Sequence, residues 1–392
     1  MAYLKNSAVN LLNLHYGLHA LALNGAGVFF AVFLLKAGVS VPAVFAAIAL
    51  VIAVRFLIRP LILVLGPRTG LRALVAFGTI FTGVQYLFLA EVRGVDVMLL
   101  GFCISAAIGD TFYWTSYHAY FAALGDSEHR GHQIGAREAL GSVAAIIGPL
   151  IGGWTLTVLG PRVAFGAAAV VHVLAALPFL GTPEVRVARN VPGAFRAAMS
   201  GMMLFAADGW IAVGYYFVWQ IALFVSLGES FTAFGGALAL AGLAGAAGGL
   251  ILGKHIDAGH GGRAVWLTFA TLAAATLLRA ASTGIVSLAI IANAVGALVV
   301  CLYTPTLMTA VYNQAKLSPC TLRFHVATEG GWDIGGASGC IVAALLSSAG
   351  APLPVEILLS LVGMVLSLIL LRRHYRTIVM PDLPLTQPAG GA

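Results

Sequence analysis

Four carboxylates of this sequence stand within long apolar stretches. Asp110 lies in GDTFYWTSYHAYF (109–121), and Asp208, Glu329 and Asp333 have similarly apolar neighbours. A charged side chain at the centre of a membrane-spanning helix costs about 2.5–3.5 kcal/mol even on the milder scales, so each is a candidate functional residue. Burial and nearby charges shift the pKa of such a group, which can then hold a proton in one state and bind a cation in another. We therefore expect proton or cation chemistry at these positions.

The aromatic residues after Asp110 follow the spacing of one helical face. Positions i, i+4, i+7 and i+11 are Asp110, Trp114, Tyr117 and Phe121, with Tyr113 and His118 beside them. Tyrosine and tryptophan also gather at lipid interfaces, which is the alternative for the rings at the end of the stretch. At mid-depth, aromatic rings attract cations and flat apolar solutes. The carboxylate and much of the aromatic set are therefore predicted to point the same way.

Other stretches carry further polar candidates. His15 and His19 are spaced i, i+4, and Asn24 follows. Two histidines at this spacing can share a metal ion, but no third ligand is identifiable, so we expect no metal. A proton or substrate role fits better, because histidine titrates near neutrality. The remaining candidates are Asp208, Tyr215, Trp219, Gln220, Asn293 and Tyr303.

The overall composition indicates a membrane protein, in whose spanning helices such residues can lie. Of 392 residues, 60% are hydrophobic and 9% are charged, whereas soluble domains average about 45–50% and about 25%. The net charge of +7 comes from basic residues scattered singly between apolar runs, which indicates membrane topology and no nucleic-acid partner. The four cysteines form no CxxC pair, so neither a disulfide framework nor a metal site is predicted.

Apolar runs long enough to cross a bilayer predict an all-α integral membrane protein, since a spanning helix needs about 20 such residues. Twelve runs are found, at 10–35, 42–65, 72–90, 96–122, 134–158, 163–181, 197–226, 232–253, 264–283, 286–312, 323–348 and 353–371. We expect a six-helix bundle over 1–181, a polar cytoplasmic linker over 182–196, a second six-helix bundle over 197–375, and a disordered cytoplasmic tail over 376–392.

The distribution of Lys and Arg predicts the orientation. With both termini cytoplasmic, fifteen of the 21 fall on the cytoplasmic side and two, Arg55 and Arg59, lie within a span. Four fall outside: Lys36, Arg93, Arg162 and Arg279. The excess of inside charge follows the positive-inside rule. We expect a multi-pass protein of the cell membrane, with a bacterial inner membrane as its setting.

The two halves also align with each other at an offset of about 190 residues. Gly38, Ser40 and Tyr113 fall on Gly228, Ser230 and Tyr303, and Glu138 falls within one residue of Glu329. Each match is weak, but unrelated coincidences would not share one offset. Two parallel six-helix repeats suggest a transporter that rocks about a central site.

Three features make the sequence similar to the major facilitator superfamily. GKHIDAGHGGR (253–263) resembles that family's cytoplasmic loop motif, with Gly253, Asp257 and Arg263 in the characteristic places. GPLIGG (148–153) is similar to the signature of its proton-driven exporters, although the usual first glycine is Ala144. The polar linker divides the chain six plus six. The resemblance implies two pseudo-symmetric six-helix bundles, with spans 1, 4, 7 and 10 around a central cavity.

This arrangement implies a role for each candidate residue. The predicted substrate or coupling cavity comprises Asp110, Tyr113, Trp114, Tyr117, His118, His15, His19, Asn24, Asp208, Tyr215, Trp219, Gln220, Asn293 and Tyr303. Span 2 lies beside span 11 in the family, so Arg55 or Arg59 is predicted to pair with Glu329 or Asp333 when the cytoplasmic side is closed. The alternative is that such pairs only neutralise buried charge. Glu138, Asp257 and Arg263 complete the predicted gating set.

We therefore expect a secondary active transporter that works by alternating access. The sequence has no GxxxxGK[ST] phosphate loop, so ATP is not the expected driver. Proton coupling and export of amphipathic or cationic compounds are favoured; proton-coupled import of a nutrient or metal chelate is the alternative. A membrane enzyme is disfavoured, because no HExxH or paired acidic motif is present. The expected partners are a small-molecule substrate, protons and the lipid bilayer, with no cofactor, and we expect a monomer.

Overall fold

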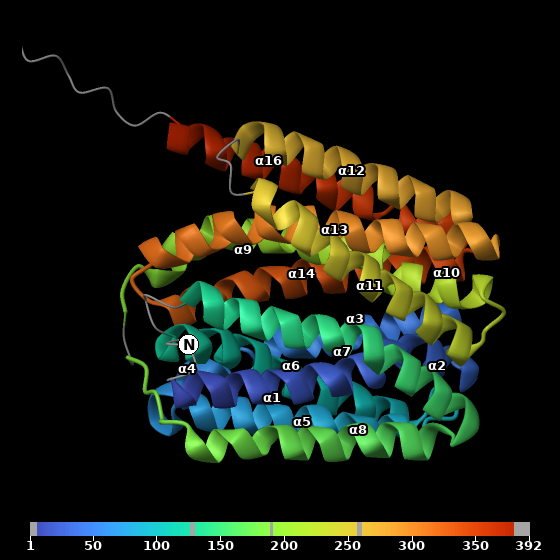
Figure 1. Cartoon of the computed structure of the whole chain (residues 1–392), viewed down its shortest axis with the longest axis horizontal. Helices are drawn as coiled ribbons and strands as arrows, with labels where there is room; N and C mark the ends of the chain where they lie inside the picture. Colours follow the sequence, from blue (N-terminus) through green and yellow to red (C-terminus); the bar gives the residue numbers. More distant parts are fainter. Residues whose placement is uncertain (1–5, 126–129, 189–190, 257–260, 380–392) are drawn as a thin grey trace, which may run out of the picture.

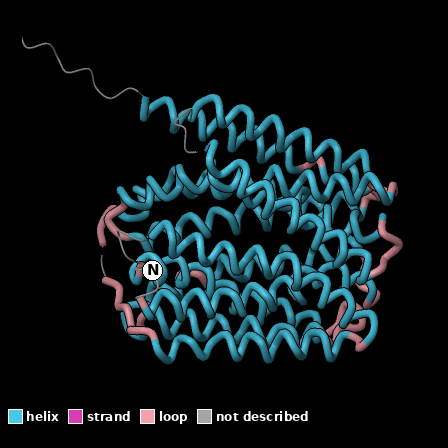
Figure 2. The backbone as a smooth tube through the Cα atoms, viewed as in Figure 1, coloured by secondary structure: helices cyan, strands magenta, loops and turns pink. Residues whose placement is uncertain are grey.

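Helices make up all regular structure in the described residues, 6–125, 130–188, 191–256 and 261–379 of a computed structural model (Figure 2). The N-terminal half comprises α1 (Ser7–Gly25), η2 (Gly27–Phe29), α2 (Phe30–Lys36), α3 (Val41–Ile58), α4 (Leu61–Thr69), α5 (Leu71–Leu89), α6 (Val97–Leu124), α7 (Arg130–Val158), α8 (Pro161–Ala176) and η3 (Leu177–Gly181). The C-terminal half comprises α9 (Ala194–Ala212), η4 (Val213–Val218), α10 (Trp219–Ser226), α11 (Phe231–Ile256), α12 (Gly261–Ser282), α13 (Val286–Leu317), α14 (Thr321–Ser348), α15 (Leu353–Ile357) and α16 (Ser360–Val379).

Eleven helices of the described part are long and apolar enough to cross a membrane. The twelfth predicted span is α14, which has 28 residues but carries Arg323, Glu329 and Asp333. Its length suffices for a span, whereas its charges lower its hydropathy. The structure thus confirms an all-helical, multi-pass membrane fold.

Several spans are interrupted, and two interruptions lie close to the polar centre. Span 2 breaks between α3 and α4 at Pro60, which has no N–H to continue the helix. Span 7 contains the π-helical turn η4, an arrangement often found at functional sites. Hydropathy and spacing predict neither break.

The two halves lie side by side in Figure 1 and meet along two helix pairs, α3 with α14 and α7 with α11. Small residues permit the close approach of α7 and α11. A Cβ on Gly242 would lie 2.7 Å from the carbonyl oxygen of Ala145, and one on Gly235 would collide with the carbonyl oxygen of Pro149. Small residues therefore line this seam between the halves.

The halves are closed at the end opposite the N-terminus. The ring of Phe29 lies 5.6 Å from that of Phe234, inside an apolar cluster drawn from both halves. At the rim, Lys36 Nζ lies 3.3 Å from Glu229 Oε2. The start of α1 and the connection between the halves both lie at the other end (Figure 1).

Candidate functional site

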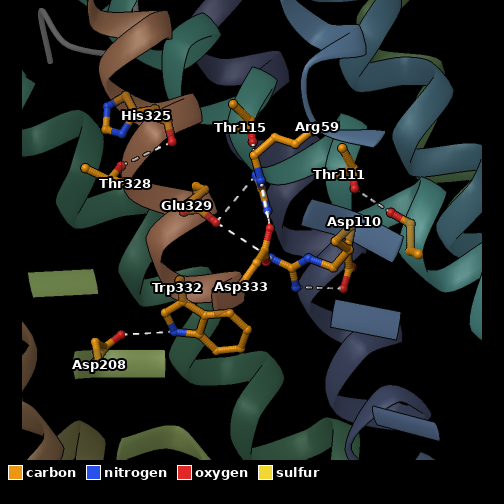
Figure 3. Close-up of polar contacts among 12 residues, drawn as sticks. Arg59, Asp110, Thr111, Thr115, Asp208, His325, Thr328, Glu329, Trp332 and Asp333 are labelled. Carbon is orange, nitrogen blue, oxygen red and sulfur yellow. Dashed lines mark hydrogen bonds and ion pairs between the residues drawn. The ribbon is translucent and has the colours of Figure 1, made fainter. Parts of the chain in front are cut away.

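Five ionisable side chains from α3, α6 and α14 meet between the halves, and Figure 3 shows most of them. Arg55 contacts carboxylates of both halves. Its Nη1 lies 3.4 Å from Asp110 Oδ2, and its Nη2 lies 3.1 Å from Asp333 Oδ1 and 3.7 Å from Glu329 Oε2. Arg55 thus links α6 of its own half with α14 of the other.

Arg59 makes the tightest contact of this cluster. Its Nε and Nη2 donate to Asp333 Oδ2 at 2.8 and 2.5 Å, and its Nη1 donates to Thr115 Oγ1 at 2.6 Å (Figure 3). Glu329 lies farther away, with Oε2 at 3.9 Å from Nη1. Arg59 ends α3 immediately before Pro60, so the helix break lies at the cluster itself. The arginines and the acids of α14 are therefore brought together, and Asp333 is the main partner.

The charges of the cluster do not cancel. Two guanidinium groups face three carboxylates, Asp110, Glu329 and Asp333, which leaves one negative charge when all are ionised. Asp333 is completely buried, whereas the Asp110 side chain is 29% exposed. A buried pair resists separation, because removal of one partner leaves an uncompensated charge. Asp110 is therefore the acid of this cluster that a solute or proton can reach most easily.

Trp332 connects the cluster to a fourth carboxylate. Its ring lies 5.2 Å from the Arg55 guanidinium carbon, and its Nε1 donates to Asp208 Oδ2 at 3.1 Å. The Tyr303 hydroxyl donates to Asp208 Oδ1 at 2.5 Å. The predicted candidates Asp208 and Tyr303 thus form a pair, and Trp332 contacts both Asp208 and Arg55.

A cavity of about 310 Å³ opens beside this cluster. Its polar wall includes Arg55, Asp110, Gln85 and Gln220, and its aromatic wall is formed by Phe30, Tyr86, Phe102, Phe217 and Trp332. Both halves contribute, and η4 carries Phe217 to the wall. Small-molecule sites are typically apolar clefts of this kind with a few oriented polar groups, and the volume of this cavity lies at the lower end of their usual range of about 300–1,000 Å³.

Several residues predicted to line the cavity lie elsewhere. Tyr113 and Tyr117 are fully buried inside the N-terminal half, where Tyr113 stacks on His19 at 3.9 Å and Tyr117 lies 5.9 Å from His15. Asp110 is thus the member of that helical face that lines the cavity. Helix α1 packs against α6 one to two turns beyond Asp110, so its side chains cover the rings of Tyr113 and Tyr117. Asn24 donates to the carbonyl oxygen of Ala20 in its own helix.

His118 lies at the seam between the halves, with Trp114 stacked on it. Their rings are 5.9 Å apart, and His118 also stacks on His325 of α14 at 5.9 Å. This contact joins α6 to α14 on the side of the cluster toward the N-terminal end of the bundle. His325 is absent from the predicted site, although its place one turn before Glu329 on the same helix is a readable signal.

Three predicted residues of the C-terminal half bind its helices together. Trp219 Nε1 donates to Asn293 Oδ1 at 3.0 Å, and the Tyr215 hydroxyl donates to the carbonyl oxygen of Gly296 at 2.9 Å. Arg279, which the charge count assigns to the outer side of the membrane, is buried in the protein at 4% exposure, with its guanidinium carbon 4.0 Å from the centre of the Tyr215 ring. Among these predicted residues of span 7, Gln220 reaches the cavity.

Of the other predicted gating residues, Glu138 does not join the cluster. Glu138 is exposed and pairs with its neighbour Arg137. Asp257 lies outside the described residues, and so does the side chain of Arg263. In the described part of the chain, no group of three or more His, Cys, Asp or Glu side chains could hold a metal ion.

Two helical halves packed around a polar cavity are the arrangement of a secondary membrane transporter. The chain belongs to the Major Facilitator Superfamily, whose family model matches residues 12–318. A comparison with curated proteins finds no match.

Solved structures of POT family transporters share the fold. The transporter PepTSo has 12% identity over 96% of this chain and 99% of that one, with a TM-score of 0.70. A POT family transporter in complex with 5-aminolevulinic acid has 12% identity over 94% and 96%, with a TM-score of 0.70. An auto-inhibited POT family peptide transporter has 13% identity over 97% and 99%, with a TM-score of 0.65. At these identities the likeness concerns the fold.

Proposed function

We propose that this transporter exchanges protons for a small, flat, amphipathic organic cation held in the central cavity. The observation that carries the proposal is Arg55, which contacts Asp110 in its own half and Asp333 and Glu329 in the other. A change of charge at Asp110 therefore alters a contact that holds the two halves together. This is the property that alternating access requires of a coupling residue.

The net charge of the cluster supports exchange. One negative charge can be neutralised either by one proton or by one solute cation, so the two compete for Asp110. The aromatic wall of Tyr86, Phe217 and Trp332 suits the flat part of such a solute. With a proton on Asp110, Arg55 loses its partner on α6 and turns to α14. When a solute cation binds at Asp110, that carboxyl has released its proton, so export of the cation is coupled to entry of a proton.

Arg55 and Asp110 also suit a second candidate, the proton-coupled import of a small nutrient that carries both charges. Their charged atoms lie 3.4 Å apart at the cavity wall, so a zwitterion could bind with one end on each. The similar POT family structure was solved in complex with 5-aminolevulinic acid, a compound of this class. In both proposals the protein is a monomer of a bacterial inner membrane, with the end that carries the N-terminus in the cytoplasm.

Transport into proteoliposomes with an imposed pH gradient tests these proposals. An acidic lumen should drive accumulation of ethidium, and Asp110→Asn should lower this flux at least tenfold. Glu91→Gln, at an exposed carboxylate of the opposite rim, is the matched control and should transport normally. Uptake of 5-aminolevulinic acid with an acidic exterior would favour import instead. A pH gradient that moves neither probe, or an Asp110→Asn variant equal to the wild type, would refute proton coupling through Asp110.

A further inference from the structure

A second group of polar side chains lies inside the N-terminal half, behind the wall of the cavity. Tyr86 lines the cavity, and its hydroxyl oxygen is buried without a hydrogen-bond partner. This oxygen lies against the bare Cα of Gly27, where a Cβ would come within 2.8 Å. The Tyr86 ring lies 5.5 Å from the ring of His172, which lies 5.1 Å from that of His19. These side chains extend from the cavity into the interior of the N-terminal half.

The hydrogen bonds of the histidines identify their free nitrogens. The Nδ1 atoms of His15 and His172 lie 2.7 and 2.9 Å from backbone carbonyl oxygens. A carbonyl oxygen can only accept, so in the neutral rings these nitrogens carry the hydrogen. The Nε2 of His15 then accepts from the Tyr113 hydroxyl at 3.1 Å, whereas the Nε2 of His172 has no partner. Neither nitrogen of His19 has a partner, although its side chain is only 1% exposed.

Four buried polar atoms therefore lie unpartnered along one line: the Tyr86 hydroxyl, His172 Nε2 and both nitrogens of His19. A buried polar group that stays unsatisfied is costly, and buried polar groups without a protein partner usually bind ordered water. The rings that carry these atoms are neighbours, with centres 5.1 and 5.5 Å apart, and neighbouring polar groups that do not bond directly are often bridged by water.

The line continues to the surface at the end that carries the N-terminus. The rings of Tyr113 and Tyr117 stack at 5.4 Å, and those of Tyr117 and Tyr16 stack at 5.8 Å. The Arg137 guanidinium carbon lies 5.3 Å from the Tyr16 ring centre, and Arg137 pairs with Glu138, whose side chain is 59% exposed. The side chains from Tyr86 to Glu138 thus form one column through the N-terminal half, called the histidine column below.

We propose that the histidine column holds ordered water and conducts protons between the cavity and this surface, apart from the route of the solute. The proposal rests on the proposed function. His19, with both nitrogens free, takes a proton on one nitrogen and releases the proton of the other to the next water. At His172 the proton binds and leaves at Nε2, because Nδ1–H stays bonded to the carbonyl oxygen of Ala168. No net charge is left behind. The titratable rings that contact His19 are His15 on its own helix, Tyr113 on α6 and His172 on α8.

This route would explain how a proton can leave while the solute path is shut. The Arg59–Asp333 contact and the His118–His325 stack join the halves beside the cavity. The histidine column lies within one half and crosses neither contact. Proton release therefore need not wait for the halves to separate.

His19→Phe tests the column, because it keeps a ring to stack on Tyr113 and removes both nitrogens. Ethidium counterflow, which needs no net proton movement, should stay within twofold of the wild type. Accumulation driven by the pH gradient should fall at least tenfold. His132→Phe, on the exposed surface of α7, should leave both unchanged. Equal loss of both activities would show a merely structural role, and loss of neither would overturn the proposal.

A measurement without transport separates this inference from the proposed function. If the wild type shows no proton-driven flux, the proposed function fails. The histidine column is then tested by magnetisation transfer from water to ¹⁵N-labelled histidine rings of the wild-type protein in lipid nanodiscs. The rings of His19 and His172 should receive magnetisation from bound water. Its absence at both rings would overturn the hydrated column whatever the solute.

Discussion

Replacement of Arg59 by methionine is expected to destabilise the protein strongly. Arg59 and Asp333 are 2% and 0% exposed, and two hydrogen bonds join them. Loss of one partner of a buried ion pair costs about 3–5 kcal/mol, because the other charge stays buried and uncompensated. Asp333→Leu should cost a similar amount by leaving Arg59 unpaired. Replacement of both by apolar residues of similar volume is often neutral or stabilising by about 1–4 kcal/mol.

The double variant therefore shows whether Arg59 and Asp333 stabilise the protein as a pair. If the two effects were additive, Arg59→Met with Asp333→Leu would lose roughly 6–10 kcal/mol, whereas we expect it within about 1 kcal/mol of the wild type. The net charge of the cluster is unchanged in the double variant, since one cation and one anion are removed. The assay is a double-mutant cycle of unfolding free energies in one mixed-micelle system.

The rim pair Lys36–Glu229 provides the matched control. It also joins the two halves, but its side chains are 44% and 45% exposed. Exposed pairs contribute about 0.2–1 kcal/mol, so the cycle of Lys36→Met with Glu229→Leu should show a coupling of that size. If the Arg59–Asp333 cycle were additive within about 0.5 kcal/mol, this ion pair would not hold the halves together.

Two further predictions concern the seam and the rim. Gly242→Ala should reduce ethidium flux at least tenfold, because its Cβ would meet the Ala145 carbonyl oxygen at 2.7 Å. Gly249→Ala, with open space around its Cβ, should transport normally, and equal activity of the two would argue against close packing at the seam. The Arg162 guanidinium donates two hydrogen bonds to Glu91 and holds the pKa of that carboxyl below its usual range. The pair therefore stabilises the folded state at pH values above the ordinary carboxyl pKa, and this stabilisation is lost as the pH falls and Glu91 takes up a proton. Arg162→Gln should raise the pKa of Glu91 in an NMR titration, and an unchanged pKa would contradict the pairing.

The apolar runs and their charges are readable from the sequence because both are local properties. Burial of about 20 apolar residues determines a spanning helix, and a carboxylate within such a run is exceptional wherever the helix lies. Hydropathy alone therefore identifies Asp110, Asp208, Glu329 and Asp333 as candidates. It identifies the α14 span as well, although the charges of that helix lower its hydropathy.

The ion-pair partner of each charged side chain cannot be predicted from the sequence in the same way. Arg59 could pair with Glu329 or Asp333, which are one turn apart on α14. The choice of Asp333 depends on where α14 crosses α3 and on the break at Pro60, which leaves the Arg59 side chain at the end of its helix. Trp332 likewise becomes a functional candidate only through the position of its ring between Arg55 and Asp208.

The sequence alone thus determined the membrane class, the helical spans and the four carboxylates of the polar centre, since length and hydropathy act within one segment. The tertiary structure decided which of them face the cavity. Tyr113 and Tyr117 share much of the helical face of Asp110, yet they are covered by α1 and lie in the histidine column. Helical spacing defines the direction of a side chain, whereas its exposure depends on where neighbouring helices cross, and that depends on contacts far apart in the chain.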